Sequence, residues 1–228
     1  MGSVRWPTTR EELVLQQVEL AALRPPPWLS QPGWVAGACF VCAPLGRQGR
    51  GQGREPAWAA AVLWTPERSE AVVVDGLLTA AYEPGLLALR EGPILEAAVR
   101  ALPRQPDVLL VNATGRDHPR RAGLALHLGA VLGIPTVGVT DRPLVARAEQ
   151  PPDVRGARTP LVLGGEVVGY CVRARAGTRP VCVHAAWRTD PRTAAEVVAA
   201  LVRRHRTPEP LRLARKAARE ARAEAARR

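Results

Sequence analysis

A short apolar run, Val108-Leu109-Leu110-Val111, restricts the fold of this chain more than any other feature. Together with the flanking Asp107 and Asn112 it has the length of a strand, and it shows no alternation of polar and apolar residues. Strands of this kind are typical of parallel sheets that helices cover on both faces. The segments on either side, Leu86–Leu102 and Arg121–Leu132, have helical periodicity. These three segments together predict an α/β domain.

The order of the other predicted elements narrows the fold class. A helix is expected to begin near Thr8 and Thr9, which Glu11 and Glu12 follow, and to stop before Arg24–Pro27. Further strands are predicted at Trp34–Ala43, Ala57–Trp64, Glu70–Leu77, Pro135–Val139, Leu161–Arg173 (a pair around Gly164 and Gly165) and Val181–His184, with a basic loop at Arg47–Glu55 and a helix at Thr193–Arg204. Three antiparallel strands followed by alternating helices and parallel strands predict a ribonuclease H-like mixed sheet flanked by helices.

The chain length of 228 residues indicates a single domain. We expect this domain to span residues 1–228, with loose termini at 1–10 and 213–228. Leu211–Arg228 is helical by propensity, but it shows no convincing apolar face, so fraying is expected. Charged residues or proline interrupt every apolar run before it reaches the roughly 20 residues of a membrane span. The first residues do not resemble a secretory signal. We therefore expect a cytoplasmic protein without membrane partners.

The net charge of +11 favours an anionic partner, and nucleic acid is the usual one. Lys216 is the only lysine, so arginine supplies almost all of this charge, and a biased coding composition is an alternative explanation. The four cysteines are Cys39, Cys42, Cys171 and Cys182. Cys39 and Cys42 have zinc-site spacing, but residues three apart on a strand point to opposite faces. Free thiols are therefore the better interpretation, with a zinc site as the alternative.

Several motifs carry a resemblance to a known family. They are Tyr82-Glu83-Pro84-Gly85, Leu89-Arg90-Glu91-Gly92-Pro93, Thr114-Gly115 with His118-Pro119-Arg120, Gly123-Leu124-Ala125, Gly133–Val139, Gln16 or Gln17, and Arg206–Arg212. Their order and spacing over nearly the whole chain resemble endonuclease V. The resemblance implies a monomeric enzyme that recognises deaminated purines, chiefly inosine, in DNA or RNA. It also implies cleavage one nucleotide to the 3′ side with magnesium or manganese, metals that prefer carboxylate ligands.

The resemblance places the catalytic positions of the family at Cys39, Glu91, Asn112, Asp141 and, for a late histidine, Trp187. Only Glu91 keeps the residue type of the family, since its other positions carry Asp, Asp, Lys and His. A thiol is a poor magnesium ligand, and Asn112 can offer only a neutral oxygen. Glu91 and Asn112 are nevertheless the candidate metal ligands. Asp141 could turn inward to compensate, although a carboxylate at a strand end is more often a helix cap or a solvated turn residue. Asp75 and Asp117 are expected to be solvated.

The nucleic-acid features of the family are better retained. Tyr82, beside Pro84 and Gly85, matches a wedge that separates strands, although a packed tyrosine at a turn is the structural alternative. Ala113, Thr114 and Gly115 match the loop that lines the extruded-base pocket, with Ala113 in place of the usual glycine. His118 could be a general base, but an ordering role in the loop is favoured. Arg120 and Arg121 are candidate phosphate ligands, or a solvated helix start. His127 and His205 are expected to be surface or packing residues.

Three hypotheses follow from these residues. The first is an endonuclease V-like protein that binds nucleic acid with lost or weakened catalysis and needs no cofactor. The second is an active, divergent nuclease that uses Glu91, Asn112 and Asp141 with magnesium or manganese. The third is a non-catalytic protein on the same fold that binds a protein partner.

Overall fold

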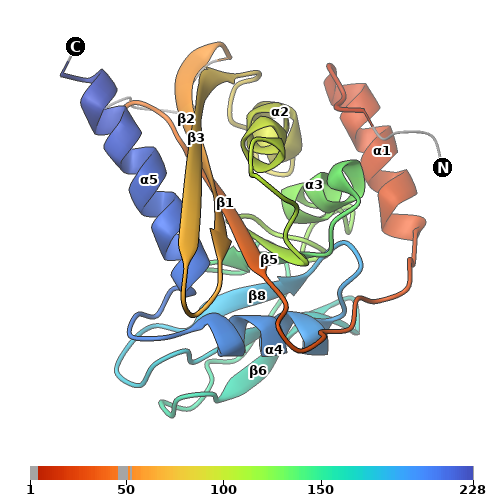
Figure 1. Cartoon of the computed structure of the whole chain (residues 1–228). Helices are drawn as coiled ribbons and strands as arrows, with labels where there is room; N and C mark the ends of the chain where they lie inside the picture. Colours follow the sequence, from red (N-terminus) through yellow and green to blue (C-terminus); the bar gives the residue numbers. More distant parts are fainter. Residues whose placement is uncertain (1–4, 46–50, 52, 228) are drawn as a thin grey trace.

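The computed structural model describes residues 5–45, 51 and 53–227, and residues 47–50 and 52 of the predicted basic loop lie outside the described residues. Eight strands form one mixed sheet in the order β3-β2-β1-β4-β5-β8-β7-β6 (Figure 1). The strands are β1 Ala36–Cys42, β2 Glu55–Trp64, β3 Ser69–Leu78, β4 Val108–Val111, β5 Thr136–Thr140, β6 Arg158–Leu163, β7 Glu166–Val172 and β8 Val181–Ala185. The helices are α1 Arg10–Ala22, α2 Leu87–Arg100, α3 Leu124–Leu132, α4 Pro191–Leu201 and α5 Glu209–Ala225.

The centre of the sheet is parallel and largely buried. β4 pairs in parallel with β1 and with β5, whereas β1, β2 and β3 form an antiparallel meander. All four residues of β4 are buried, as the apolar run predicts. Helices α1, α2 and α3 cover one face of the sheet, and α4 and α5 cover the other (Figure 1). The predicted ribonuclease H-like α/β fold is confirmed.

The prediction of a loose segment 213–228 is wrong for residues 213–225, and residue 228 lies outside the described residues. α5 continues to Ala225 and packs against β1, β2 and β3 along the left side of the view in Figure 1. Its buried residues are Pro210, Leu211, Ala214 and Ala218. Alanine side chains are small, and they let the helix lie close to the sheet without forming a strongly apolar stripe in the sequence.

The N-terminal segment is also anchored over its described part. The indole Nε1 of Trp6 donates to Glu96, with 2.6 Å between the two atoms, and the Trp6 ring stacks on His127 at 4.7 Å between centroids. Pro7 is buried. The predicted loose segment 1–10 is therefore wrong for residues 5–10, and residues 1–4 lie outside the described residues.

The start of α3 differs from its predicted boundary. The helix was expected from Arg121, but it begins at Leu124 with Gly123 as N-cap. Arg121 has a φ of +58°, which an α-helix does not contain. A Cβ atom on Gly123 would lie 2.3 Å from the carbonyl oxygen of Thr114, so only glycine permits this approach between the helix start and the preceding loop.

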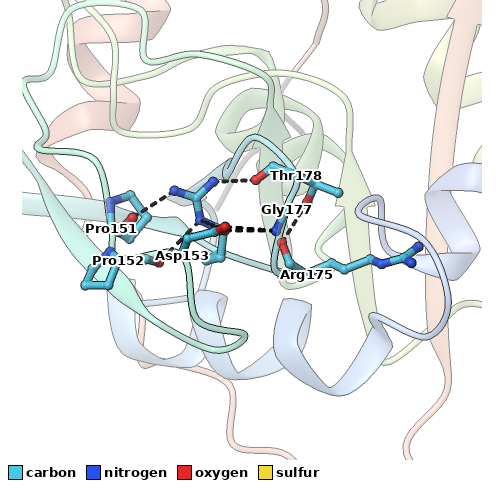
Figure 2. A network of polar contacts seen from close by, with 7 residues as sticks. Pro151, Pro152, Asp153, Arg175, Gly177 and Thr178 are labelled. Carbon is cyan, nitrogen blue, oxygen red and sulfur yellow. Dashed lines mark hydrogen bonds and ion pairs between the residues drawn. The ribbon is translucent and has the colours of Figure 1, made fainter.

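A network of polar contacts fixes the long connection between β5 and β6 (Figure 2). The guanidinium of Arg173 donates to the carbonyl oxygens of Pro151 and Pro152 on one side and of Thr178 on the other. Asp153 accepts from the backbone N–H of Gly177 at 2.9 Å. The connection is therefore tied to the turn between β7 and β8.

Candidate functional site

The loop after β3 meets the loop after β4 at one carbonyl group. The Gly85 oxygen accepts from Gln17 Nε2 at 3.1 Å, from Arg120 Nη2 at 2.9 Å and from His118 Nε2 at 3.1 Å. Gly85 has a φ of +79°, a conformation in which glycine is favoured. These bonds join α1 and both loops, so of the two predicted candidates Gln16 and Gln17, the latter holds the loops together.

His118 orders this junction. Its Nδ1 accepts from the backbone N–H of Arg120 at 3.1 Å, which leaves Nε2 as the N–H donor to Gly85. Burial lowers the pKa of His118 to about 4, so the ring is neutral. With both ring nitrogens engaged, this geometry favours the predicted ordering role over a general base.

The two candidate phosphate arginines are largely occupied by structural contacts. Arg120 Nε donates to Gln17 Oε1 at 2.6 Å, in addition to its bond to Gly85. Arg121 Nη2 donates to the Leu163 carbonyl at 2.8 Å, and its Nη1 pairs with Glu166 at 3.0 Å. Arg120 thus stabilises the loop junction, and Arg121 joins this region to the β6–β7 hairpin.

The two loops border a cavity of about 450 Å³, which we call the loop pocket. Its lining includes the predicted residues Tyr82, Pro84, Gly85, Asn112, Ala113, Thr114, His118 and Asp141, together with residues 142–144. Tyr82 is 44% exposed and so presents its ring to solvent at the edge. Gly115 does not line the loop pocket; a Cβ there would lie 2.1 Å from the Ala185 carbonyl oxygen, so its smallness permits close backbone packing.

Asp117 is fully buried, and the prediction of a solvated residue is wrong. Its carboxylate accepts three backbone N–H bonds, from Leu144 at 2.7 Å, Val145 at 2.9 Å and Ala146 at 2.7 Å. His184 lies beside it, with 3.6 Å between Nδ1 and Oδ2. Asp117 therefore holds the backbone of residues 144–146, of which Leu144 lines the loop pocket. Asp75, by contrast, is exposed as predicted.

Four of the five expected catalytic positions, Cys39, Glu91, Asn112 and Asp141, are not brought together as metal ligands. Cys39 is fully buried, and burial together with the nearby Glu91 raises the pKa of its thiol. Burial raises the pKa of Glu91 to about 7. Asn112 Oδ1 accepts a hydrogen bond from the guanidinium of Arg215. Asp141 is exposed and pairs with Arg206 instead of turning inward.

This donor set does not fit a divalent metal. It comprises a protonated thiol, one carboxyl group in a desolvated position and a neutral amide that a cation already contacts. Magnesium and manganese prefer several charged oxygen ligands. Among the described residues, no group of three His, Cys, Asp or Glu side chains is arranged to hold a metal ion.

The residue near the C-terminus that reaches Asn112 is Arg215. It is not Trp187, where the late histidine of the family was expected. Trp187 is 7% exposed, and its backbone N–H donates to Thr136 Oγ1 at 3.1 Å, so the residue belongs to the core. The prediction that Trp187 lies in the site is therefore wrong, because the residue lies in the core. Arg215 follows the buried residues Leu211 and Ala214 on α5, and no pattern in the sequence distinguishes it from the other arginines of this segment.

The cysteines are free thiols, as predicted, and Cys42 is only partly buried. Cys39 and Cys42 point to opposite faces of the sheet, since Cys39 belongs to the core under α2 and Cys42 Sγ lies 3.3 Å from the Ala218 carbonyl on α5. The Sγ atoms of Cys171 and Cys182 lie 3.4 Å apart on paired strands. His127 is a packing residue, one of the two predicted possibilities, whereas His205 is exposed.

Comparison with known proteins decides the family. The model of the endonuclease V family matches residues 45–216 of this chain. The chain belongs to the endonuclease V family. Endonuclease V of Methanopyrus kandleri is 49% identical over 159 residues, which are 68% of this chain and 69% of that protein.

Solved endonuclease V structures share the fold over almost the whole chain. The crystal structure of the Streptomyces avermitilis endonuclease V has a TM-score of 0.86 at 34% identity and covers 97% of this chain and 96% of that one. Ciona intestinalis endonuclease V, solved with a 24mer DNA containing an inosine followed by a ribo-adenosine, has a TM-score of 0.76 at 22% identity. It covers 94% of this chain and 97% of that one, and the likeness concerns the fold. No helix in the described part of the chain is long and apolar enough to span a membrane.

Proposed function

We propose that this protein binds DNA or RNA that contains deaminated bases and does not cut it by the metal-dependent reaction of its family. The observation that carries the proposal is the guanidinium of Arg215 on Asn112, at the end of β4 where cleavage would require a metal ligand. A cation at this position repels a divalent metal, and a neutral amide does not compensate for that repulsion. This contact supports the part of the proposal that concerns the loss of metal-dependent cleavage.

The loop pocket supports the binding half of the proposal. Its volume of about 450 Å³ suits one extruded nucleobase, and Tyr82 at its edge offers an aromatic face for stacking. Thr114 supplies a polar group inside the pocket, and the hydrogen bonds at Gly85 fix the shape of the two loops. Inosine, the base in the DNA bound to the Ciona protein, is the first ligand to test.

The geometry disfavours the active-nuclease alternative. That alternative needs Asp141 beside Glu91 and Asn112, whereas Asp141 is paired with Arg206. If the proposal holds, no magnesium or manganese is required. The single-domain organisation, the monomeric state and the cytoplasmic location remain predictions.

A nicking and retention assay tests the proposal. Labelled inosine-containing DNA and RNA, as single strands and duplexes, are incubated with magnesium and then manganese, beside the Glu91→Ala variant. We expect no cleavage, together with retention whose affinity falls linearly with salt on logarithmic axes. Metal-dependent cleavage that Glu91→Ala abolishes would establish the active nuclease. The absence of both cleavage and retention would favour a protein-binding role on this fold.

A further inference from the structure

A row of cations on α5 and the preceding loop lines a groove of about 760 Å³, which we call the arginine groove. Its lining residues are Asp141, His205, Arg206, Thr207, Arg212, Arg215, Lys216, Arg219, Glu220 and Ala223. Four arginines and the only lysine thus face two carboxylates. Such an excess of positive charge along a groove attracts an extended polyanion.

Arg215 and Arg219 are the cations of this groove without an acidic partner. Among the described residues neither forms a salt bridge, whereas Arg206 pairs with Asp141 and Arg212 pairs with Glu209. Both guanidinium groups lie 5.7 Å from the centroid of the Phe40 ring. The ring fixes their position but supplies no countercharge.

Of these two arginines, Arg215 has the environment that an anion would stabilise most. Burial, Arg219 and Arg206 all lower the pKa of its guanidinium, in that order, so the group is desolvated beside like charges. Within the described part of the chain, its buried Nε has no hydrogen-bond partner. A buried donor without an acceptor is costly, and an incoming oxyanion would remove that cost.

The arginine groove adjoins the loop pocket. Asp141 lines both cavities, and Asn112 of the loop pocket accepts its hydrogen bond from Arg215. A strand whose base enters the loop pocket would therefore place a neighbouring backbone phosphate near α5.

We propose that Arg215 and Arg219 bind the phosphodiester backbone next to the recognised base, in the place where relatives would use a divalent cation. This inference rests on the proposed function and deepens it, because it assigns the phosphate site and makes binding independent of metal. A guanidinium neutralises one phosphate charge and can donate two parallel hydrogen bonds to its oxygens.

The test measures the affinity of the full chain for an inosine-containing single strand over a series of salt concentrations, with and without a chelator. The variants are Arg215→Gln and Arg219→Gln. The control is Arg104→Gln, which removes an exposed charge from the loop before β4, at the opposite end of that strand from Asn112. Thermal unfolding confirms that each variant folds, and exposed Arg219 remains informative if Arg215→Gln does not.

We expect Arg215→Gln to weaken binding about tenfold and Arg219→Gln to weaken it in the same direction. Each loss of a phosphate contact should reduce the slope of log affinity against log salt by about 0.7. The control and the chelator should change neither quantity. Inorganic phosphate should compete no better than sodium chloride of equal ionic strength, because the site takes a diester within a strand.

Three outcomes would overturn the inference. Unchanged affinity and slope in both variants, with a wild type that binds, would refute the phosphate site and leave the proposed function standing. Binding lost with the chelator would show that a metal is needed. A wild type that retains no nucleic acid would refute the proposed function as well.

Discussion

The loop junction at Gly85 and the expected metal centre around Asn112 lie within one fold but differ in what holds them together. At the junction, Gln17, His118 and Arg120 converge on one carbonyl oxygen, and all these bonds are made within the protein. At the expected metal centre, by contrast, the guanidinium of Arg215 donates a hydrogen bond to the side-chain amide of Asn112. A cluster of carboxylates is stable only with the cation it binds, so a few substitutions suffice to dismantle it. A closed hydrogen-bond network does not depend on an external ion and persists.

The largest effect is expected from breaking the pocket wall. Asp117→Ala should lower the free energy of unfolding by about 3 to 5 kcal/mol, because three buried N–H groups lose their acceptor. Denaturant titration measures this change. The control Asp75→Ala removes an exposed carboxylate and should stay within about 0.5 kcal/mol of the wild type. Equal effects in the two variants would contradict the structural role of Asp117.

A second prediction concerns a variant in which the metal ligands of the family are introduced. The triple variant Cys39→Asp, Asn112→Asp, Arg215→Gln restores two carboxylates near Glu91 and removes the competing cation. It should be less stable than the wild type without metal, and manganese at about 100 times its Kd should return about 2.7 kcal/mol. Thermal unfolding with and without manganese measures this difference. A wild type that manganese stabilises equally would show that the native site still binds metal.

A smaller effect is expected at the edge of the loop pocket. Tyr82→Ala should weaken single-strand binding by about 1 to 3 kcal/mol per stacked base, whereas Tyr82→Phe should retain the affinity, because stacking needs the ring and not the hydroxyl. The ring is 44% exposed, so the unfolding midpoint should hardly change. Loss of stability with unchanged binding would instead identify Tyr82 as a packing residue.

The smallest effect concerns pH. Burial lowers the pKa of His127 to about 4, below its ordinary 6.5, so the unfolded chain binds more protons between these values and stability falls as the pH is lowered through this window. His127→Phe keeps a ring against Trp6 and should remove about 1 to 2 kcal/mol of this loss at pH 5. Unfolding at pH 5 and pH 8 tests this. An equal change at both pH values would show that the effect is packing alone.

The sequence predicts the order of strands and helices along the chain well, because residue periodicity and apolar runs are local properties. The buried run Val108–Val111 and the paired strands around Gly164 and Gly165 are both found in the structure. The family resemblance also singles out Tyr82, Ala113 and Thr114, which line one pocket, and Gly115, which does not. The predicted site roles await the experiments above.

Two features could not be predicted because they depend on long-range contacts. Asp117 follows a strand end, where a carboxylate is usually solvated, and its three donors come from a segment almost thirty residues further along the chain. Arg215 looks like one arginine among many in a basic tail. Only the packing of Ala214 and Ala218 against the sheet turns it toward Asn112.

The anchoring of residues 144–146 by Asp117 has a consequence for the speed of recognition. Leu144 lines the loop pocket, and its backbone is held by a fully buried carboxylate rather than by surface contacts. The entropic cost of ordering this segment is therefore incurred during folding and not when a ligand binds. A ligand should then bind to a preformed pocket, with an association rate set by diffusion and charge. Discrimination between bases should appear in the dissociation rate, which is slowest for the base that fits the pocket.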